Sequence, residues 1–300
     1  MDRLASIRRR YAEEIRAAAN LRSAALVEAF AAVPRERFLG PGPWQILNAA
    51  PGLRERLTRG RHRGYRTTPD DSPEHLYQNV LVAIDPARGL NNGLPSALAF
   101  WLDALGLHTA EHALHVGCGL GYYTAIMAEV VGPAGRVVGV EIDAELASRA
   151  RENLAHLGHV DVLHGDGGES AGASFDAIFI NAGASSPRDV WLDGLKPGGR
   201  LILPLTTDEG KGGMLKVERG EGGYAARFIS NVSVYPCVGS RDAELSRGLR
   251  RALAGGRWKS VRSLRRGRHE ADGTCLMHGS GFCLSTLPVS EGGGTLTDFP

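Results

Sequence analysis

The chain contains 300 residues, of which 43% are hydrophobic, and its formal net charge is +2. Such a chain can bury a full core, as one large domain or as one domain with extensions. The charge is too small for a strong non-specific nucleic-acid surface, and no apolar run in the sequence approaches the about 20 residues that span a membrane. Arginine is dense in residues 54–66 and 241–268. We interpret both segments as solvated surface; the alternative is a surface that guides an anionic substrate or a peptide.

The N-terminal residues and the cysteines indicate a cellular setting. Residues 1–20, MDRLASIRRRYAEEIRAAAN, predict a charged amphipathic helix without the apolar centre of a signal peptide. The four cysteines are Cys118, Cys237, Cys275 and Cys283. They form no CxxC pair, which indicates neither a disulfide framework nor a redox motif. We therefore expect a reduced, cytoplasmic setting.

The first third of the sequence is expected to be helical and irregular. Apolar residues recur at helical spacing before Pro34, which predicts one or two helices. The segment FLGPGPWQILNAAPG (residues 38–52) is broken by proline and glycine and is predicted to be a loop. A further helix is expected over residues 95–107, with Ser96 near its start and Gly106 near its end.

The pattern changes at His112 into short apolar runs that alternate with helical segments. The predicted strands are HALHVG, RVVGVE, VDVLHG, FDAIFINA and RLILPL. Helices are expected in YYTAIMAEVV, AELASRARENLAHL and PRDVWLDGL. This alternation predicts an α/β fold with a doubly wound, mostly parallel sheet. After Leu205, two extended runs around a Gly-rich turn predict an antiparallel hairpin that closes the sheet edge, followed by a basic helix and a Gly-rich tail.

A glycine-rich turn, VGCGLG, follows the first predicted strand of this sheet and precedes its first helix. Gly117, Gly119 and Gly121 permit a tight turn and a close approach of the backbone to a ligand. Glu141 ends the second strand about 20 residues further on, where a carboxylate can accept two ribose hydroxyls. The order and spacing of these features predict a ligand that contains a nucleoside.

The glycine spacing also bears on which nucleoside is bound. A dinucleotide site would normally show GxGxxG, with the pyrophosphate at the helix N-terminus. This chain has GxGxG followed by Tyr122 and, at the end of the third strand, the segment GDG that contains Asp166 and Gly167. A carboxylate there can accept a hydrogen bond from the exocyclic amine of adenine, which fits S-adenosyl-L-methionine (SAM).

Several segments together resemble the class I SAM-dependent methyltransferases and, within them, the protein-L-isoaspartate O-methyltransferase family. The resemblance covers residues 33–236 and rests on VPRERFLGPG, LYQNVLVAID, HGDG, FDAIFINAGA and LKPGGRLILPL. It implies a Rossmann-like methyltransferase fold with SAM as cofactor, in which the three glycines lie against the methionine part. The predicted cofactor-binding residues are Gly117, Cys118, Gly119, Gly121, Tyr122, Glu141, Ile142, Asp166, Gly167 and Asn181.

The sequence differs from the family pattern in its first motif, and it also lacks a catalytic dyad. Many relatives carry an acid two residues before the first glycine, where this chain has His115. No obvious catalytic dyad occurs in the core motifs of the sequence. A carboxylate acceptor needs none, because it is already an anion near neutral pH, so the enzyme mainly positions the reactants and excludes water.

The loop GLNNGLPSAL (residues 89–98) is the predicted acceptor side of the site. The family resemblance implies a Thr-Ile-Ser-type stretch before a proline here, with a hydroxyl that holds the target carboxylate; this chain has Asn91, Asn92 and Gly93. Two side-chain amides can donate hydrogen bonds in its place, so Asn91 and Asn92 are the predicted catalytic residues. The alternative is a helix-entry loop that asparagine suits structurally. The predicted substrate-binding residues are Tyr77, Asn91, Asn92, Gly93, Ala182, Gly183 and Ala184.

The tail contains RHEADGTCLMHGSGFC, with His269, Cys275, His278 and Cys283. These residue types suit zinc, but their spacing matches no familiar finger or ribbon. We therefore predict no metal site and expect ordinary packing or a flap over the substrate.

These observations predict three consecutive parts: an N-terminal helical, substrate-side segment (1–90), a SAM-binding methyltransferase domain (91–240) and a C-terminal extension (241–300). The predicted function is methyl transfer from SAM to a carboxylate of a protein or peptide, as in the isoaspartyl family. The alternatives are another acceptor (a modified peptide, a small natural product or RNA) and a SAM-binding sensor without transferase activity. A membrane partner is excluded, nucleic acid is disfavoured, and a homodimer is a possible assembly.

Overall fold

A computed structural model describes residues 3–48, 64–169, 174–234, 237, 242–254, 256–279 and 281–289. The chain forms two compact units that interleave along the sequence. Unit 1 comprises residues 1–110, 118–139 and 143–163, and unit 2 comprises residues 111–117, 140–142 and 164–300. No helix among the described residues is long and apolar enough to cross a membrane. Most of the arginine-rich segment at 54–66 lies outside the described residues.

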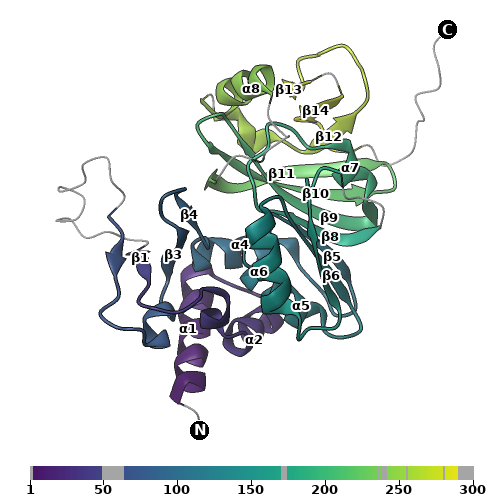
Figure 1. The fold of residues 1–300 in the computed structure, drawn as a ribbon. Helices are drawn as coiled ribbons and strands as arrows, with labels where there is room; N and C mark the ends of the chain where they lie inside the picture. The colour runs from purple at the N-terminus through teal and green to yellow at the C-terminus, as the bar shows by residue number, and fades with distance from the viewer. Residues whose placement is uncertain are drawn as a thin grey trace. The chain divides into compact units, whose positions relative to one another are not determined.

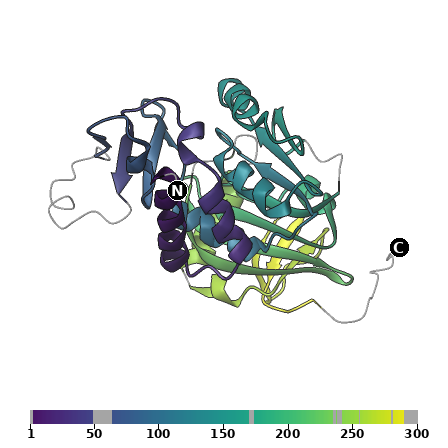
Figure 2. The same cartoon turned by 90° about the horizontal axis from the view of Figure 1, so that it is seen from below.

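Unit 1 begins with the two helices that the apolar spacing predicts, α1 (Arg3–Ala19) and α2 (Ala24–Ala32). They pack against each other, as both views of the fold show (Figures 1 and 2). Tyr11 and Ile15, one helical turn apart, are buried on α1, so a single stripe of that helix enters the core. The hydroxyl of Ser23 caps α2 by accepting a hydrogen bond from the backbone N–H of Leu26 at 3.2 Å.

A small antiparallel sheet follows in unit 1, in the order β2-β1-β3-β4. Its strands are β1 (Gln45–Asn48), β2 (Arg66–Thr67), β3 (Val80–Asp85) and β4 (Leu90–Asn91), and the short helices η1 (Arg35–Phe38) and η2 (Pro73–Leu76) precede β1 and β3. The prediction of a loop over residues 38–52 is therefore wrong at β1. A cluster of buried apolar residues explains the strand, since Trp44 and Ile46 pack with Val80 and Val82. The N-terminal segment is thus not only helical.

Three further helices belong to unit 1: α4 (Pro95–Leu105), α5 (Tyr122–Val131) and α6 (Ala144–Leu154). Gly106, with a φ of +68°, ends α4. Helix α5 spans the segment YYTAIMAEVV that the sequence predicts, with Gly121 at its N-cap. Asp143 caps α6 and accepts a hydrogen bond from the backbone N–H of Leu146 at 3.0 Å. The helices predicted over residues 95–107 and in the segments YYTAIMAEVV and AELASRARENLAHL are therefore present.

The large sheet has the strand order β13-β14-β12-β11-β10-β9-β8-β5-β6-β7. Its predicted part consists of β5 (His112–Val116), β6 (Arg136–Glu141), β7 (Val160–His164), β8 (Phe175–Ile180) and β9 (Leu195–Thr206), with the short helix α7 (Asp189–Asp193) between β8 and β9. Strand β8 pairs in parallel with both β5 and β9. It is buried along almost its whole length, as expected for a central parallel strand. The predicted α/β fold is confirmed.

The predicted hairpin is also present, but it does not end the sheet. Strands β10 (Lys211–Gly220) and β11 (Gly223–Ser233) pair antiparallel, and β10 pairs with β9 (Figure 1). The C-terminal extension adds α8 (Ala243–Ala254), η3 (Arg257–Ser260), β12 (Ser263–Arg266), β13 (Cys275–His278) and β14 (Phe282–Ser285). Strand β12 pairs with β11 at Tyr224 and Ala225. The prediction that the hairpin closes the sheet edge is therefore wrong, because three strands of the extension continue the sheet.

Candidate functional site

The carboxyl ends of four strands meet at one edge of unit 2, and backbone hydrogen bonds fix them there. These bonds run from Asn181 N to Val116 O (2.8 Å), from Gly117 N to Val140 O (2.8 Å) and from Gly165 N to Glu141 O (3.0 Å). They join the ends of β5, β6, β7 and β8. Ligands of open α/β sheets bind beyond such ends, so this edge is the candidate site. Five of the predicted cofactor-binding residues lie along it: Gly117, Glu141, Asp166, Gly167 and Asn181.

Glu141 is the last residue of β6, and its side chain is nearly buried, with 7% of the residue exposed. The next residue, Ile142, is 44% exposed, which is unusual for a large apolar side chain in this fold. A carboxylate beside an exposed apolar surface suits a nucleoside, since the first accepts ribose hydroxyls and the second covers a flat base. Both residues were predicted from the sequence, and their placement fits the cofactor that the motifs indicate.

Asp166 follows β7 and is held in place by two contacts within unit 2. Its Oδ1 accepts a hydrogen bond from the backbone N–H of Gly168 at 2.8 Å, and its Oδ2 lies 3.2 Å from Nη1 of Arg188. Arg188 passes so close to Gly168 that a Cβ there would lie 1.9 Å from its Nη1. Arg188 was not among the residues predicted from the sequence, because nothing in the segment PRDVWLDGL separates it from an ordinary surface arginine.

The glycine turn itself continues into unit 1, where it starts α5. Gly121 has a φ of +93°, and its backbone N–H donates to the carbonyl of Cys118 at 2.9 Å. A Cβ at Gly121 would lie 2.7 Å from Cδ1 of Leu154. A side chain is therefore excluded both by the left-handed backbone and by the neighbouring helix. Gly119, also left-handed with a φ of +56°, has open space where its Cβ would be.

Tyr122, the first residue of α5, has its ring inside unit 1. It is 3% exposed and lies edge-on to Phe30, Phe38 and Tyr123, with ring centroids 5.0–6.4 Å apart. Cys118 is also buried, and its Sγ would lie 3.2 Å from a Cβ on Gly139. Both residues were predicted to bind the cofactor. Their side chains fill the core instead, which leaves the backbone of the turn as the part of each that suits a ligand.

His115 occupies a buried position on β5 and stacks on Phe179, with ring centroids 5.2 Å apart. Burial lowers the pKa of His115 to about 3, so the imidazole is neutral at physiological pH. A neutral core histidine does not replace the acid that many relatives carry at this position. The departure noted in the sequence is thus a packing feature of the strand.

The buried imidazole predicts an acid-sensitive fold. Its folded pKa lies below the unfolded value of about 6.5, so the unfolded chain binds the extra proton as the pH falls. The stability that His115 contributes is complete above about pH 6.5 and is lost towards pH 3, at on the order of 1 kcal/mol per pH unit. We expect His115→Leu to flatten this dependence in urea unfolding at pH 7 and pH 5. The exposed His156, changed to Gln, is the control, and an unchanged slope in His115→Leu would contradict the assignment.

In the predicted acceptor loop, the side chain of Asn92 is hydrogen-bonded within unit 1. Its Oδ1 accepts hydrogen bonds from the backbone N–H of Val82 at 3.0 Å and from Nη2 of Arg35 at 3.2 Å. Its own backbone N–H donates to the carbonyl of Val82 at 3.0 Å. The side-chain oxygen therefore ties the loop to β3. This is the geometry of a positioning residue, and it favours the structural alternative for Asn92 over the predicted catalytic role.

Arg35 is the residue of this region that sequence reasoning missed as a functional one. It is completely buried, and its guanidinium donates to three backbone carbonyls between η2 and β3 as well as to Asn92. The only signal was its place in the segment VPRERF, which is part of the resemblance to the family. Tyr77, predicted to bind substrate, belongs to the same network: its hydroxyl donates to Glu36 and accepts from the backbone N–H of Arg35. Burial raises the pKa of Tyr77 well above its ordinary value.

Asn91 and Gly93 form the turn itself. Oδ1 of Asn91 accepts a hydrogen bond from the backbone N–H of Gly93 at 3.0 Å, and Asn91 is half-buried at the end of β4. Gly93 has a φ of +76°, and a Cβ there would lie 2.8 Å from Cδ2 of Leu98. A side chain at the position where the resemblance implies a hydroxyl would therefore strain this backbone and require Leu98 to move.

Restoring that hydroxyl is expected to damage the fold. We expect Gly93→Ser to lower the free energy of unfolding by about 2–4 kcal/mol, from backbone strain and from overlap with Leu98. Gly89→Ala is a matched control, because Gly89 is also left-handed (φ +72°) but has nothing within 4 Å of its Cβ position. It should lose only the strain, about 1–2 kcal/mol. Urea unfolding measures both, and equal losses in the two variants would contradict the predicted clash.

The loop after β8 contains the predicted substrate-binding residues of unit 2. Asn181 and Ala182 are half-buried, whereas Ala184 is fully buried and bridges in parallel to Leu205. A Cβ at Gly183 would lie 2.3 Å from Oγ1 of Thr206, so this loop packs closely on β9. Of the predicted residues, Asn181 and Ala182 have exposed surface for an acceptor, and the side chain of Ala184 has none.

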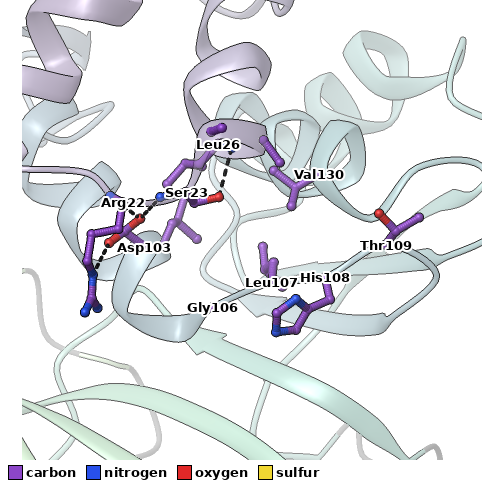
Figure 3. A pocket seen from close by; sticks show the side chains of 12 residues that line it. Arg22, Ser23, Leu26, Asp103, Gly106, Leu107, His108, Thr109 and Val130 are labelled. Atoms are coloured by element: carbon purple, nitrogen blue, oxygen red, sulfur yellow. Dashed lines mark hydrogen bonds and ion pairs between the residues drawn. The ribbon is translucent and has the colours of Figure 1, made fainter.

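A separate cleft of about 460 Å³ lies within unit 1, between the start of α2 and the end of α4 (Figure 3). Asp103 points to its rim, where Oδ1 accepts hydrogen bonds from the backbone N–H groups of Arg22 and Ser23 at 3.1 and 2.8 Å. This carboxylate supports the chain entering α2 and is engaged by the protein itself. None of the predicted site residues lines this cleft.

Comparison with known sequences decides the family. The profile of the family described as Protein-L-isoaspartate(D-aspartate) O-methyltransferase (PCMT) matches residues 69–242, more than half of the chain. The chain belongs to this family. A protein-L-isoaspartate O-methyltransferase of Ignicoccus hospitalis is 33% identical over 174 residues, which cover 57% of this chain and 82% of the relative. One of Methanopyrus kandleri is 32% identical over 203 residues, covering 66% of this chain and 76% of the relative.

This protein-L-isoaspartate O-methyltransferase family member shares its fold with solved structures. A structure of a protein-L-isoaspartate O-methyltransferase aligns with a TM-score of 0.60 at 19% identity, over 93% of this chain and 87% of that one. A Plasmodium falciparum protein, described as a member of the same family in complex with S-adenosyl-L-homocysteine, aligns with a TM-score of 0.57 at 18% identity, over 77% of this chain and 97% of that one. The family match ends at residue 242, so most of the C-terminal extension lies outside it.

Proposed function

We propose that this family member transfers the methyl group of SAM to a carboxylate of an isoaspartyl residue in a protein or peptide. The carrying observation is the edge of unit 2, where Gly117, Glu141 and Asp166 meet at the ends of adjacent strands in a chain that belongs to the family. SAM fits this edge because the carboxylate of Glu141 and the exposed side chain of Ile142 suit a nucleoside. When bound, SAM supplies an electrophilic methyl group on a sulfonium.

The residues of the chain have a positioning task in this reaction. The acceptor carboxylate forms the new C–O bond while the bond from the methyl carbon to sulfur breaks, and the products are a methyl ester and a neutral thioether. No proton moves, so no general base is required. Asn181 and Ala182, which have exposed surface, are the proposed acceptor contacts of unit 2, and Asn91 is the proposed contact of unit 1. Asn92 is proposed to hold the acceptor loop in place through Arg35 and Val82.

A matched pair of peptides tests this function. The protein is incubated with SAM labelled in the methyl group and with two peptides of one sequence, one with an isoaspartyl and one with an ordinary aspartyl residue. We expect base-labile label in the isoaspartyl peptide only. Asn91→Ala should raise the KM for the peptide while leaving the affinity for SAM unchanged. Absence of methyl ester in the isoaspartyl peptide, with SAM binding intact, would contradict the proposed acceptor.

A second acceptor is favoured by one specific observation, the backbone at Gly93. The resemblance implies a hydroxyl at this position, whereas the φ of +76° and the approach of Leu98 both disfavour any side chain there. A loop built from Asn91 and Gly93 suits a different peptide carboxylate or a modified peptide. Label in a panel of unmodified and modified peptides, but not in the isoaspartyl peptide, would support this reading over the first.

The cellular compartment and the oligomeric state of the protein are also proposals. The four cysteines form no disulfide with one another, which supports a reducing environment such as the cytoplasm. Self-association as a homodimer stays a prediction, which light scattering of the purified protein tests.

A further inference from the structure

Four side chains of the C-terminal extension, predicted from the sequence not to bind a metal, converge in unit 2. We propose that His269, Cys275, His278 and Cys283 form a closed, structural zinc site. One ligand atom of each, a ring nitrogen or a sulfur, lies within 4.8 Å of every other. Sγ of Cys275 and Nε2 of His269 are 3.5 Å apart. The edges of a tetrahedral ZnS₂N₂ site are about 3.3–3.8 Å long, given Zn–N and Zn–S bonds of about 2.0–2.3 Å, so this edge is already of the right length.

The spacing of the ligands along the chain hid this arrangement. Cys275 and His278 are three residues apart on β13, and in a regular strand such residues point to opposite faces. The pairing of β13 with β14 shifts register between Cys275 and Met277, however: Cys275 pairs with Ser285, and Met277 already pairs with Leu284. The extra residue of this bulge reverses the alternation. Cys275 and His278 can therefore act from one face, and Met277 remains in the core.

The pairing also brings in the third and fourth ligands. His278 lies directly opposite Cys283 in the register of β13 and β14. His269 follows β12, and its ring lies 4.6 Å from that of His278 between centroids, at 87°. The four ligands thus come from β13, β14 and the segment that connects β12 to β13. A metal bound by them would join that connection to the hairpin.

The choice of zinc follows from the ligand set. Two thiolates and two imidazoles in a compact group suit tetrahedral Zn²⁺ better than the hard cations Mg²⁺ and Ca²⁺, which prefer oxygen. Binding would form two Zn–S and two Zn–N bonds, and the two thiol protons would leave to solvent. Four protein ligands leave no open position, which is the pattern of a structural site.

The surroundings of Cys275 suit a bound thiolate. The backbone N–H of Asp272 donates to Sγ of Cys275 at 3.4 Å. Hydrogen bonds of this kind orient metal-binding sulfurs. The thiol of Cys275 donates to Oδ1 of Asp272 at 3.5 Å, a contact that a metal would replace, and the charge of that carboxylate is balanced by Arg265 at 3.5 Å. The strands themselves are short, four residues each, so a metal would supply stability that their packing alone provides only in part.

The experiment is a measurement of metal content on the full-length protein. It is purified under reducing conditions from medium with added zinc, without a histidine tag, and analysed by mass spectrometry of the elements. We expect about one zinc per chain, and Cys275→Ala/Cys283→Ala should reduce it to near zero. Cys237→Ala removes another buried cysteine, and His156→Gln an exposed histidine outside the cluster; both should keep the metal.

A second measurement on the unchanged sequence covers the case in which the double variant fails to fold. After removal of zinc, titration with Co²⁺ should give the visible absorption of tetrahedral cobalt and a thiolate charge-transfer band, both abolished by one equivalent of Zn²⁺. Three results would overturn the proposal: no zinc and no cobalt spectrum, zinc content unchanged in the double variant, or a Cys275–Cys283 disulfide in the protein as purified. Since metal content is read directly, these outcomes do not depend on methyl transfer.

Discussion

Replacing Glu141 with alanine is expected to weaken SAM binding by about 100- to 1,000-fold. Glu141 is the last residue of β6 at the candidate edge, where two ribose hydroxyls can donate hydrogen bonds to its carboxylate. Each hydrogen bond to a charged group contributes about 1.5–3 kcal/mol, and a loss of about 3–4 kcal/mol corresponds to this change in the dissociation constant. Glu141→Gln, which keeps one acceptor oxygen, should lose about tenfold. Calorimetric titration with SAM measures both.

The control for this series is Glu145→Ala. Its carboxylate belongs to the first turn of α6, only four residues away, but its side chain is 77% exposed. Its removal should leave SAM affinity unchanged, which separates the placement of the acid from its charge. Equal affinities of Glu141→Ala and the unchanged protein would contradict the assignment of Glu141 to the ribose.

Replacing Arg35 is expected to have the largest effect on stability. Its guanidinium donates to the carbonyls of Leu76 (2.6 Å), Gln78 (3.2 Å) and Val80 (2.8 Å) and to Oδ1 of Asn92 (3.2 Å). Arg35→Met keeps much of the volume but removes all four hydrogen bonds from a buried region, and among the described residues only Oδ1 of Asn92 and the carbonyl of Gln78 keep another backbone donor, from Val82 and Val80 respectively. We expect a loss of about 3–5 kcal/mol in the free energy of unfolding. Urea unfolding measures the loss, and hydrogen exchange at residues 80–92 locates it.

Arg37→Ala is the matched control for Arg35. It lies two residues further along η1, is exposed, and contacts His156 through Nη1 at 3.0 Å. Its loss should change stability by less than about 0.5 kcal/mol. If Arg35→Met unfolds no more easily than Arg37→Ala, the network around Asn92 does not hold the acceptor loop.

Local signals in the sequence were sufficient for the fold of the cofactor side. The glycine turn, the apolar strands and the helix caps are short-range features, so α5 and the strand that ends at Glu141 could be placed from neighbouring residues alone. The family motifs lie in the same segments. This is why the predicted acid and glycines fall at the ends of adjacent strands.

The rest depends on contacts between distant parts of the chain. Arg35 and Asn92 are 57 residues apart, and no local pattern reveals that the arginine occupies the carbonyls beside the loop. Tyr122 was assigned to the cofactor from its place after the turn, whereas the packing of its ring with Phe30 and Phe38 was not visible in sequence. The alignment of Cys275 with His278 requires a bulge, which changes the alternation that spacing arguments assume.

The continuation of the sheet beyond β11 also affects whether another copy of the protein can pair with the sheet edge. The hairpin strand β11 is 11 residues long, and an uncovered strand of that length is a template on which another chain can add a strand. Strand β12 pairs with one end of it, and Trp258 covers Phe228 further along, with ring centroids 5.6 Å apart. The final edge is β13, only four residues long and interrupted by a bulge. The extension therefore covers one end of a long edge and ends the sheet in a short, irregular strand, and both features disfavour strand addition by another copy.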